Sequence, residues 1–268
     1  MILMGKEIGW RRPPFYVAEL SQNYRDLKEA YALMKACKEA GADAVKIQAL
    51  DPNELASKSS SIYHLYTNNI SSVPELFDYG RDLDIPVFAS VFGLRSLDIL
   101  DALDCPAYKI ASFENNWPEL IEACRGTEKP LLISTGMEGL PDLQSELAQI
   151  DTVYMHCVSA YPCPLENAAL NKLRYLGEMV HYYGYSDHTM GCRAAEYAVA
   201  LGAQIIEKHV CLNDAAIDGH FAARPYQFRT MVENCNEAWE AVYHGVGNVE
   251  EAMKQYKRKD VGGVILRG

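Results

Sequence analysis

Two lysines in this sequence lie within short apolar runs, where a charged side chain must be paired or solvated. Lys46 lies in AVKIQ and Lys109 lies in AYKIAS. Hydroxyl residues end the same or similar runs, among them Ser90, Ser112 and Ser134. Two ammonium groups and several hydroxyls that converge on one point suit a phosphate group. For either lysine alone, the alternative is a salt bridge to a neighbouring carboxylate.

Two histidines form a second candidate pair. His188 ends the run GYSDH, and His209 lies 21 residues later in IIEKHV. Consecutive parallel strands lie about 4.8 Å apart, so strands carrying these residues would let both imidazoles reach one divalent cation. Imidazole combined with carboxylate or water suits manganese, iron, cobalt or zinc better than calcium. The alternative for a single histidine is an ordinary hydrogen-bonded polar residue.

Further polar side chains share this location at the ends of apolar runs. They are Glu19, Gln22, Asn23, Gln48, Glu114, Thr135, Ser159, Tyr161, Ser186, Asp187, Glu207 and Lys208. Apolar strands tolerate such groups only when the groups are hydrogen-bonded or solvated. The pattern therefore indicates one polar cavity at the strand ends.

The elements that would position these residues follow a regular alternation of apolar runs and amphipathic segments. The predicted strands lie near 16–20, 44–48, 87–91, 107–112, 131–136, 153–159, 184–188 and 205–210. Strands alternating with helices predict βαβ units, and eight units fit an α/β fold of the (β/α)8 TIM-barrel type. The alternative is an open doubly wound sheet, although no GxGxxG follows the first strand. We predict one barrel domain over 1–268, with a tail over 245–268.

Composition narrows the class of protein. The 268 residues are 49% hydrophobic and 23% charged, which predicts a folded chain with a substantial core rather than a disordered one. The formal net charge of −11 argues against nucleic acid or an anionic membrane as the main partner. No apolar run is long enough to span a membrane, and the opening residues do not resemble a signal peptide.

The cysteines indicate a compartment. Eight cysteines are scattered without a CxxC pair, which is typical of free thiols in a reducing cytoplasm. Cys163 and Cys211 are candidate nucleophiles, but a role as small packing residues is the favoured interpretation. We therefore expect a cytoplasmic location.

Several motifs, in order along the chain, carry a family resemblance. AELSQN, KEAGADAVKIQ, YKIASFENN, KPLLISTGM, HCVSAYPCP, GYSDHTMG and ALGAQIIEKHV resemble the sialic acid synthase (N-acetylneuraminate synthase) family. The likeness runs from about Tyr16 to His209. It implies a (β/α)8 catalytic barrel and an enzyme that condenses phosphoenolpyruvate with an amino-sugar aldehyde such as N-acetylmannosamine. The implied products are a nonulosonic acid and phosphate.

The resemblance also implies roles for individual residues. The implied phosphoenolpyruvate contacts are Lys46, Lys109, Ser112, Ser134 and Ser186. The implied catalytic residues are Glu19, Lys46, Lys109 and His188. His188 and His209 match ligands of a divalent metal, Mn or Mg. The residues that match other substrate-binding positions are Gln48, Glu114, Ser159 and Tyr161.

The sequence departs from the family pattern at the mouth of the predicted barrel. The family's NHNG reads Asn23-Tyr24-Arg25-Asp26, a common PFD reads Val91-Phe92-Gly93, and a PDH-like motif reads Asp218-Gly219-His220. The family's C-terminal antifreeze-like domain is not recognisable, since the chain ends in KRKDVGGVILRG.

These departures leave alternatives open. One is a synthase with another aldehyde acceptor that needs a partner module, and another is a non-catalytic barrel that binds phosphoenolpyruvate or a sugar. A third is a metal-dependent aldolase. We expect small-molecule substrates, a homodimer, and a separate antifreeze-like partner if the missing module comes from another chain.

Overall fold

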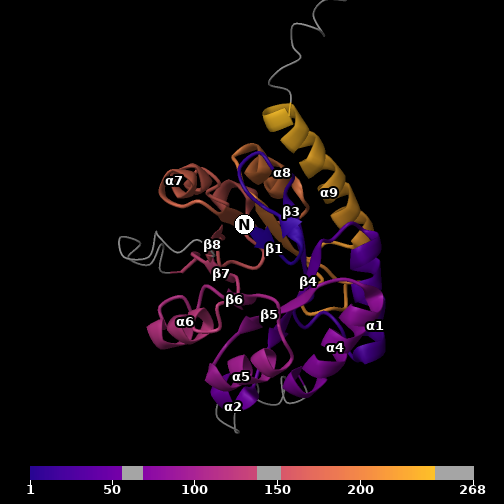
Figure 1. The fold of residues 1–268 in the computed structure, drawn as a ribbon. Helices are drawn as coiled ribbons and strands as arrows, with labels where there is room; N and C mark the ends of the chain where they lie inside the picture. The colour runs from indigo at the N-terminus through magenta and orange to yellow at the C-terminus, as the bar shows by residue number, and fades with distance from the viewer. Residues whose placement is uncertain (56–68, 138–151, 245–268) are drawn as a thin grey trace, which may run out of the picture.

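Eight parallel strands form a closed barrel in the computed structural model, which describes residues 1–55, 69–137 and 152–244 (Figure 1). The barrel strands are β3 (Phe15–Glu19), β4 (Ala44–Ala49), β5 (Val87–Val91), β6 (Tyr108–Ile110), β7 (Leu131–Ser134), β8 (Thr152–His156), β9 (Tyr183–Asp187) and β10 (Ile205–His209). Strand β10 pairs in parallel with β3, with His209 opposite Glu19, and this pairing closes the sheet. The predicted TIM barrel is confirmed, and the open doubly wound alternative is wrong.

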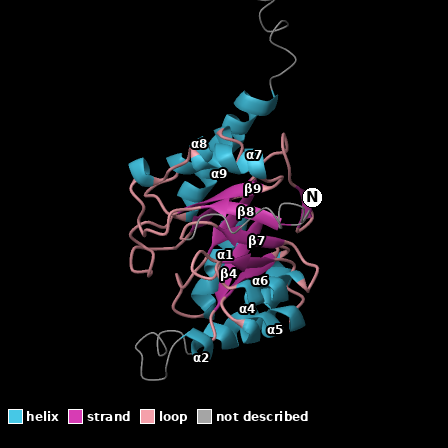
Figure 2. Ribbon diagram, turned by 90° about the vertical axis from the view of Figure 1, so that its left-hand side faces the viewer, coloured by secondary structure: helices cyan, strands magenta, loops and turns pink. Residues whose placement is uncertain are grey.

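Helices surround the barrel on its outside, as the end-on view of Figure 1 and the side view of Figure 2 show. They are α1 (Leu27–Glu39), α2 (Pro52–Leu55), α4 (Asn69–Leu83), α5 (Leu94–Ala102), α6 (Pro118–Arg125), α7 (Lys172–Met179), α8 (Arg193–Ala200) and α9 (Pro225–Trp239). A 3₁₀ turn lies at Leu165–Asn167, and a π-helical turn at Glu240–His244 follows α9. No helix among these described residues is long and apolar enough to cross a membrane. One of the amphipathic segments between the predicted strands, LPDLQSELAQI, and the predicted tail over 245–268 lie outside the described residues.

Helix α1 shows why these segments fold locally. The Asp26 carboxylate caps the helix by accepting a hydrogen bond of 2.8 Å from the Glu29 amide. Residues Ala30, Leu33, Met34 and Cys37 recur at helical spacing and are buried against the barrel. The helix ends before Gly41, whose φ of +93° lies in the left-handed region that glycine adopts without a steric cost.

Two features differ from the sequence-based expectation. A short hairpin of β1 (Ile2–Leu3) and β2 (Lys6–Glu7) precedes the barrel, and Lys6 donates 2.7 Å hydrogen bonds to the Pro14 carbonyl and the Asp43 carboxylate. Its two-residue strands are too short for a periodic signal. Strands β6, β7 and β8 also end earlier than predicted, at Ile110, Ser134 and His156. The polar residues that follow them therefore lie in loops.

Candidate active site

The carboxyl ends of the strands bring buried polar side chains together in ladder register. Glu19 lies opposite Lys46, and Ser90 lies opposite Lys109. Ser186 and Glu207 are opposite each other on β9 and β10. A TIM barrel concentrates its chemistry at this end, because the loops after all strands meet there.

Lys46 lies at the centre of an ionic cluster. Its Nζ lies 2.6 Å from Glu19 Oε2 and 3.6 Å from Glu207 Oε1, and it donates a 2.9 Å hydrogen bond to Ser90 Oγ. Burial alone lowers the pKa of Lys46, but the two carboxylates outweigh burial and raise this pKa above its usual value. Lys46 is therefore a fixed positive charge whose own counter-ions are part of the protein.

Lys109 is buried without such a counter-ion. Its Nζ donates to Ser134 Oγ and approaches the Ile110 carbonyl at 3.5 Å, and among the described residues it forms no salt bridge. Burial lowers the pKa of Lys109, and the charge of Lys46 lowers it further against the attraction of Glu207. A buried ammonium without a paired carboxylate suits an anionic ligand, because the ligand would supply the missing charge.

A small polar pocket lies beside Lys109. Ser112 Oγ accepts a 3.1 Å hydrogen bond from the Gly136 amide and lies 3.0 Å from Cys157 Sγ. A Cβ on Gly136 would lie 2.8 Å from both Ser112 Oγ and Ser159 Oγ, so only glycine fits here without displacing them. Ser159 Oγ is buried and has no hydrogen-bond partner among the described residues. A ligand hydroxyl or phosphate oxygen would satisfy it.

The two predicted metal-ligating histidines lie side by side, with ring centroids 5.4 Å apart. His188 Nδ1 lies 2.7 Å from the Val158 carbonyl, and His209 Nδ1 lies 2.8 Å from Asp218 Oδ2. A carbonyl can only accept, so His188 carries its proton on Nδ1, and the lone pair lies on Nε2, which is 3.4 Å from Ser186 Oγ. Burial, followed by the charge of His209, lowers the pKa of His188 to about 3, which keeps this imidazole neutral at pH 7.

These histidines fit a divalent cation. An oriented imidazole whose second nitrogen is held by a carbonyl or carboxylate is the usual form of a histidine ligand. Among the described residues no group of three or more His, Cys, Asp or Glu is placed to hold a metal. The protein would therefore supply two nitrogen ligands, and water or substrate oxygens would complete the coordination.

The predicted acceptor-side residues surround the histidines and the lysines. The Tyr161 ring lies 4.3 Å from the His188 ring and remains about half exposed. Burial raises the pKa of Glu114 to about 7, and Glu114 Oε2 has no hydrogen-bond partner among the described residues. Gln48 is half-buried on the same face of β4 as Lys46, because alternate strand residues share a face.

Three residues of the site were noted in the sequence without the contacts that the structure gives them. Glu207 accepts a 2.8 Å hydrogen bond from Ser186 and lies in the Lys46 cluster. Ser90 binds Lys46, and Asp218 holds His209. Glu207 and Ser90 carried the strand-end signal, whereas Asp218 lies in a loop whose path the sequence does not reveal.

Two strand-end residues point away from the site. Lys208 and Asp187 form a fully buried ion pair of 3.0 Å, and Lys208 also donates to the Thr189 carbonyl at 2.6 Å. They alternate with the site residues along β9 and β10, so they lie between the barrel and its helices. Cys163 and Cys211 are buried as well, and burial raises the pKa of each thiol, which is the opposite of an activated nucleophile.

Comparison with known proteins identifies the family. The sequence profile of the NeuB family matches residues 33–247. Pseudaminic acid synthase of Helicobacter pylori is 37% identical over 251 residues, which cover 83% of this chain and 73% of that protein. The chain belongs to the NeuB family. It is therefore a phosphoenolpyruvate-condensing transferase of the sialic and nonulosonic acid synthase type, as the motifs predicted.

Other relatives support the same membership and differ in their named products. N-acetylneuraminate-9-phosphate synthase of Mus musculus is 28% identical over 239 residues, covering 78% of this NeuB-family chain and 65% of the mouse protein. The crystal structure of N-acetylneuraminic acid synthetase from Leptospira borgpetersenii, in complex with citrate, has a TM-score of 0.86 at 25% identity and covers 96% of both chains.

Proposed function

We propose that this protein joins phosphoenolpyruvate to an N-acetylmannosamine-like amino-sugar aldehyde, giving a sialic-type nonulosonic acid and phosphate. The observation that carries the proposal is Lys109, a buried ammonium that has no carboxylate partner in the part of the chain that the structure describes, beside the paired ammonium of Lys46. The relatives are named for pseudaminic acid, N,N'-diacetyllegionaminic acid and N-acetylneuraminate 9-phosphate, so amino-sugar aldehydes form the acceptor class. The reaction would run in the cytoplasm, where phosphoenolpyruvate is available.

The phosphate of phosphoenolpyruvate would bind at Lys109. Ser134 already contacts the Lys109 ammonium, and Ser112 with the Gly136 backbone adds a small polar cradle beside it. Lys46 lies close enough for its charge to lower the pKa of Lys109, so it supplies a second positive charge near the phosphate. Together these groups would stabilise the negative charge that develops on the departing phosphate.

His188 and His209 would hold a divalent cation, Mn or Mg, through Nε2. Such a cation supplies Lewis-acid polarisation of the acceptor aldehyde oxygen. The protein's own contribution is orientation: the Val158 carbonyl and the Asp218 carboxylate fix the planes of the two rings. Tyr161, packed against His188, would form one wall of the acceptor site.

The bonds that form and break in the proposed reaction suggest a role for Glu19. C3 of phosphoenolpyruvate forms the new bond to the aldehyde carbon, whose oxygen takes up a proton, and C2 acquires cationic character. Water adds to C2 and loses one proton, which balances the proton taken up by the aldehyde oxygen. The C2–O bond to phosphate then breaks, the remaining hydroxyl proton leaves with the phosphate as HPO₄²⁻, and the C2 ketone forms. Within residues 1–55, 69–137 and 152–244, Glu19 Oε2 is paired with Lys46 and has no other hydrogen-bond partner, so it can stabilise the charge at C2 or direct the water. Positioning both substrates together supplies a further large part of the acceleration.

Phosphate release tests this proposal. The purified protein is incubated with phosphoenolpyruvate, Mn²⁺ and a panel of aldehydes that includes N-acetylmannosamine, and the free phosphate is measured. We expect release only with an acceptor, and loss of release in His188→Ala and Lys109→Ala. His181→Ala and Lys172→Ala are matched controls, because both side chains are exposed and neither forms an ion pair with the site residues in the described part of the chain. Tight phosphoenolpyruvate binding without release for any acceptor would instead support a binding barrel, or a synthase that needs a partner module.

A further inference from the structure

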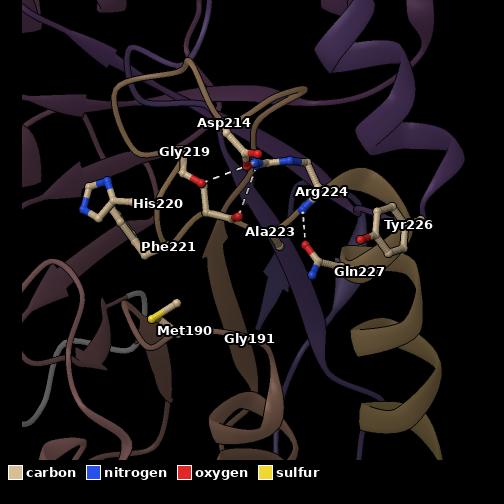
Figure 3. Close-up of a pocket in the computed structure, with 11 residues that line it drawn as sticks. Met190, Gly191, Asp214, Gly219, His220, Phe221, Ala223, Arg224, Tyr226 and Gln227 are labelled. Atoms are coloured by element: carbon tan, nitrogen blue, oxygen red, sulfur yellow. Dashed lines mark hydrogen bonds and ion pairs between the residues drawn. The ribbon is translucent and has the colours of Figure 1, made fainter.

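The loop that follows β10 is held together by one arginine from outside it. Residues 211–223 leave the end of β10 and return to it, because the Cys211 amide donates to the Ala223 carbonyl at 3.0 Å and the Ala223 amide donates to the His209 carbonyl at 2.8 Å. Arg224 follows directly and precedes α9. Figure 3 shows its side chain reaching back from the start of α9 to Asp214 and Gly219.

Arg224 lies at the N-cap of α9, but its side chain does not cap the helix. It is the N-cap of α9, where residues with a side-chain acceptor are preferred and where a guanidinium has no acceptor to offer. Gln227 satisfies the start of the helix instead, by accepting a 2.8 Å hydrogen bond from the Arg224 amide. The guanidinium is therefore free to bind the loop.

The guanidinium spans the loop through several contacts. Nη2 donates to Asp214 and to the Gly219 carbonyl at 3.2 Å, and Nη1 contacts Cys211 Sγ and the Ala222 carbonyl at 3.4 Å. The Asp214 side chain is 95% exposed, so this ion pair alone contributes little. The contacts of the guanidinium to the loop backbone and to the buried Cys211 thiol fix the conformation of the loop, because the planar guanidinium binds several points at once.

The loop packs tightly at the place that Arg224 bridges. A Cβ on Gly219 would lie 2.5 Å from the Asp214 carbonyl oxygen, so the two segments of the loop touch there. Gly219 is adjacent to Asp218, whose carboxylate holds His209 Nδ1 at 2.8 Å. Asn23 fixes Asp218 from the other side, with a 2.9 Å hydrogen bond to the Asp218 amide and one of 3.1 Å to its carboxylate.

We propose that Arg224 is a positioning residue for the metal site: by fixing the 211–223 loop it holds Asp218, and through Asp218 it sets the orientation of His209. This inference rests on the proposed function, because it assumes that His188 and His209 bind a divalent cation. It assigns to Arg224 no contact with substrate or metal.

Metal affinity and loop dynamics test the inference together. The variants are Arg224→Ala, Asp218→Asn and their combination, and Mn²⁺ binding is followed by the electron paramagnetic resonance signal of free Mn²⁺. Loss of the group that orients a histidine ligand typically costs about 10- to 100-fold in metal affinity, so we expect about tenfold weaker Mn²⁺ binding in Arg224→Ala. Phosphoenolpyruvate affinity should change by less than about twofold, since Lys109 and Ser134 are untouched. Hydrogen exchange of the 211–223 amides, measured without metal, should become faster.

Matched variants keep the test specific. Arg229→Ala removes an arginine from the same helix whose guanidinium donates to the Glu39 carbonyl, and it should bind Mn²⁺ as the unaltered protein does. Arg224→Lys keeps the positive charge but lacks the planar guanidinium, so its Mn²⁺ affinity should also be reduced. This variant replaces Arg224→Ala if Arg224→Ala does not fold. The double variant should bind Mn²⁺ no more weakly than Asp218→Asn alone, because both changes act through one carboxylate.

The outcomes separate this inference from the proposed function. Unchanged Mn²⁺ affinity in Arg224→Ala and Arg224→Lys would overturn the positioning role and leave the synthase intact. A double variant weakened by the product of the two single effects would also overturn it, because Arg224 would then act independently of Asp218. If the unaltered protein binds no Mn²⁺, the metal site of the proposed function fails, and the inference falls with it.

Discussion

Lys46 and Lys109 are both buried, but they differ in their partners. Lys46 forms ion pairs with Glu19 and Glu207, whereas Lys109 binds a serine hydroxyl and a carbonyl. Removing Lys46 would leave two buried carboxylates unpaired, and removing Lys109 would leave none. The same substitution should therefore have different consequences at the two positions.

The first prediction compares Lys46→Met with Lys109→Met. Lys46→Met should lower the free energy of unfolding by about 3 kcal/mol or more, because removing one partner of a buried ion pair leaves a buried charge without compensation. Lys109→Met should fold with nearly unchanged stability and bind phosphoenolpyruvate about 10- to 100-fold more weakly, the loss expected for a hydrogen bond to a charged group. Denaturant unfolding and calorimetric titration measure both. Equal destabilisation of the two variants would contradict the assigned pairing.

The second prediction concerns Glu114. Its pKa in the folded protein is raised to about 7 by burial, so between about pH 4.5 and pH 7 the folded state binds more protons than the unfolded state. The stability contributed by this group is therefore present at low pH and is lost as the pH rises through 7. Glu114→Gln should be about 1–2 kcal/mol more stable than the unaltered protein at pH 8, after allowance for partial exposure, and nearly equal at pH 5. Thermal unfolding at the two pH values decides this, and a pH-independent difference would refute it.

At the scale of elements, the turn after β7 leaves a space beside Ser112 and Ser159 that only a glycine keeps open. The third prediction is that Gly136→Ala destabilises the protein by about 1–3 kcal/mol and weakens phosphoenolpyruvate binding, because the new methyl group must displace those hydroxyls. Gly126→Ala is the control, since its φ of −59° suits alanine and its nearest atoms lie 3.4 Å away. Titration of both variants with phosphoenolpyruvate separates them. Unimpaired binding by Gly136→Ala would show that this pocket does not hold the ligand.

The sequence predicted the barrel and its strand ends but not the pairing of the side chains there, for physical reasons. The barrel and its strand-end residues were predictable, because alternating β and α periods leave a parallel sheet as the natural solution and its carboxyl ends meet at one face. The pairing of Lys46 with Glu19, and the lack of a salt bridge from Lys109 to any described carboxylate, depend on register and rotamer, which periodicity does not specify. Asp218 was not predictable as the partner of His209, because a loop held by Arg224 carries it there.

At the scale of the whole molecule, an acidic protein gathers two buried ammonium groups and two buried carboxylates at one end of its barrel. The net charge of −11 is spread over the chain, while Lys46 and Lys109 are concentrated at the mouth of a closed barrel. The buried, low-dielectric surroundings make their charges more effective there than at the surface. The net charge argues against large anionic partners but is uninformative about a small-molecule substrate.

The formation of a carbon–carbon bond tests the proposed reaction most directly. Phosphoenolpyruvate labelled with ¹³C at C3 is incubated with Mn²⁺ and the acceptor that gives the fastest phosphate release, and the product is followed by NMR. The label should appear as a methylene carbon bonded to the former aldehyde carbon, with one phosphate released for each methylene formed. Label found only in pyruvate, or left in phosphoenolpyruvate with every acceptor, would contradict a condensing synthase.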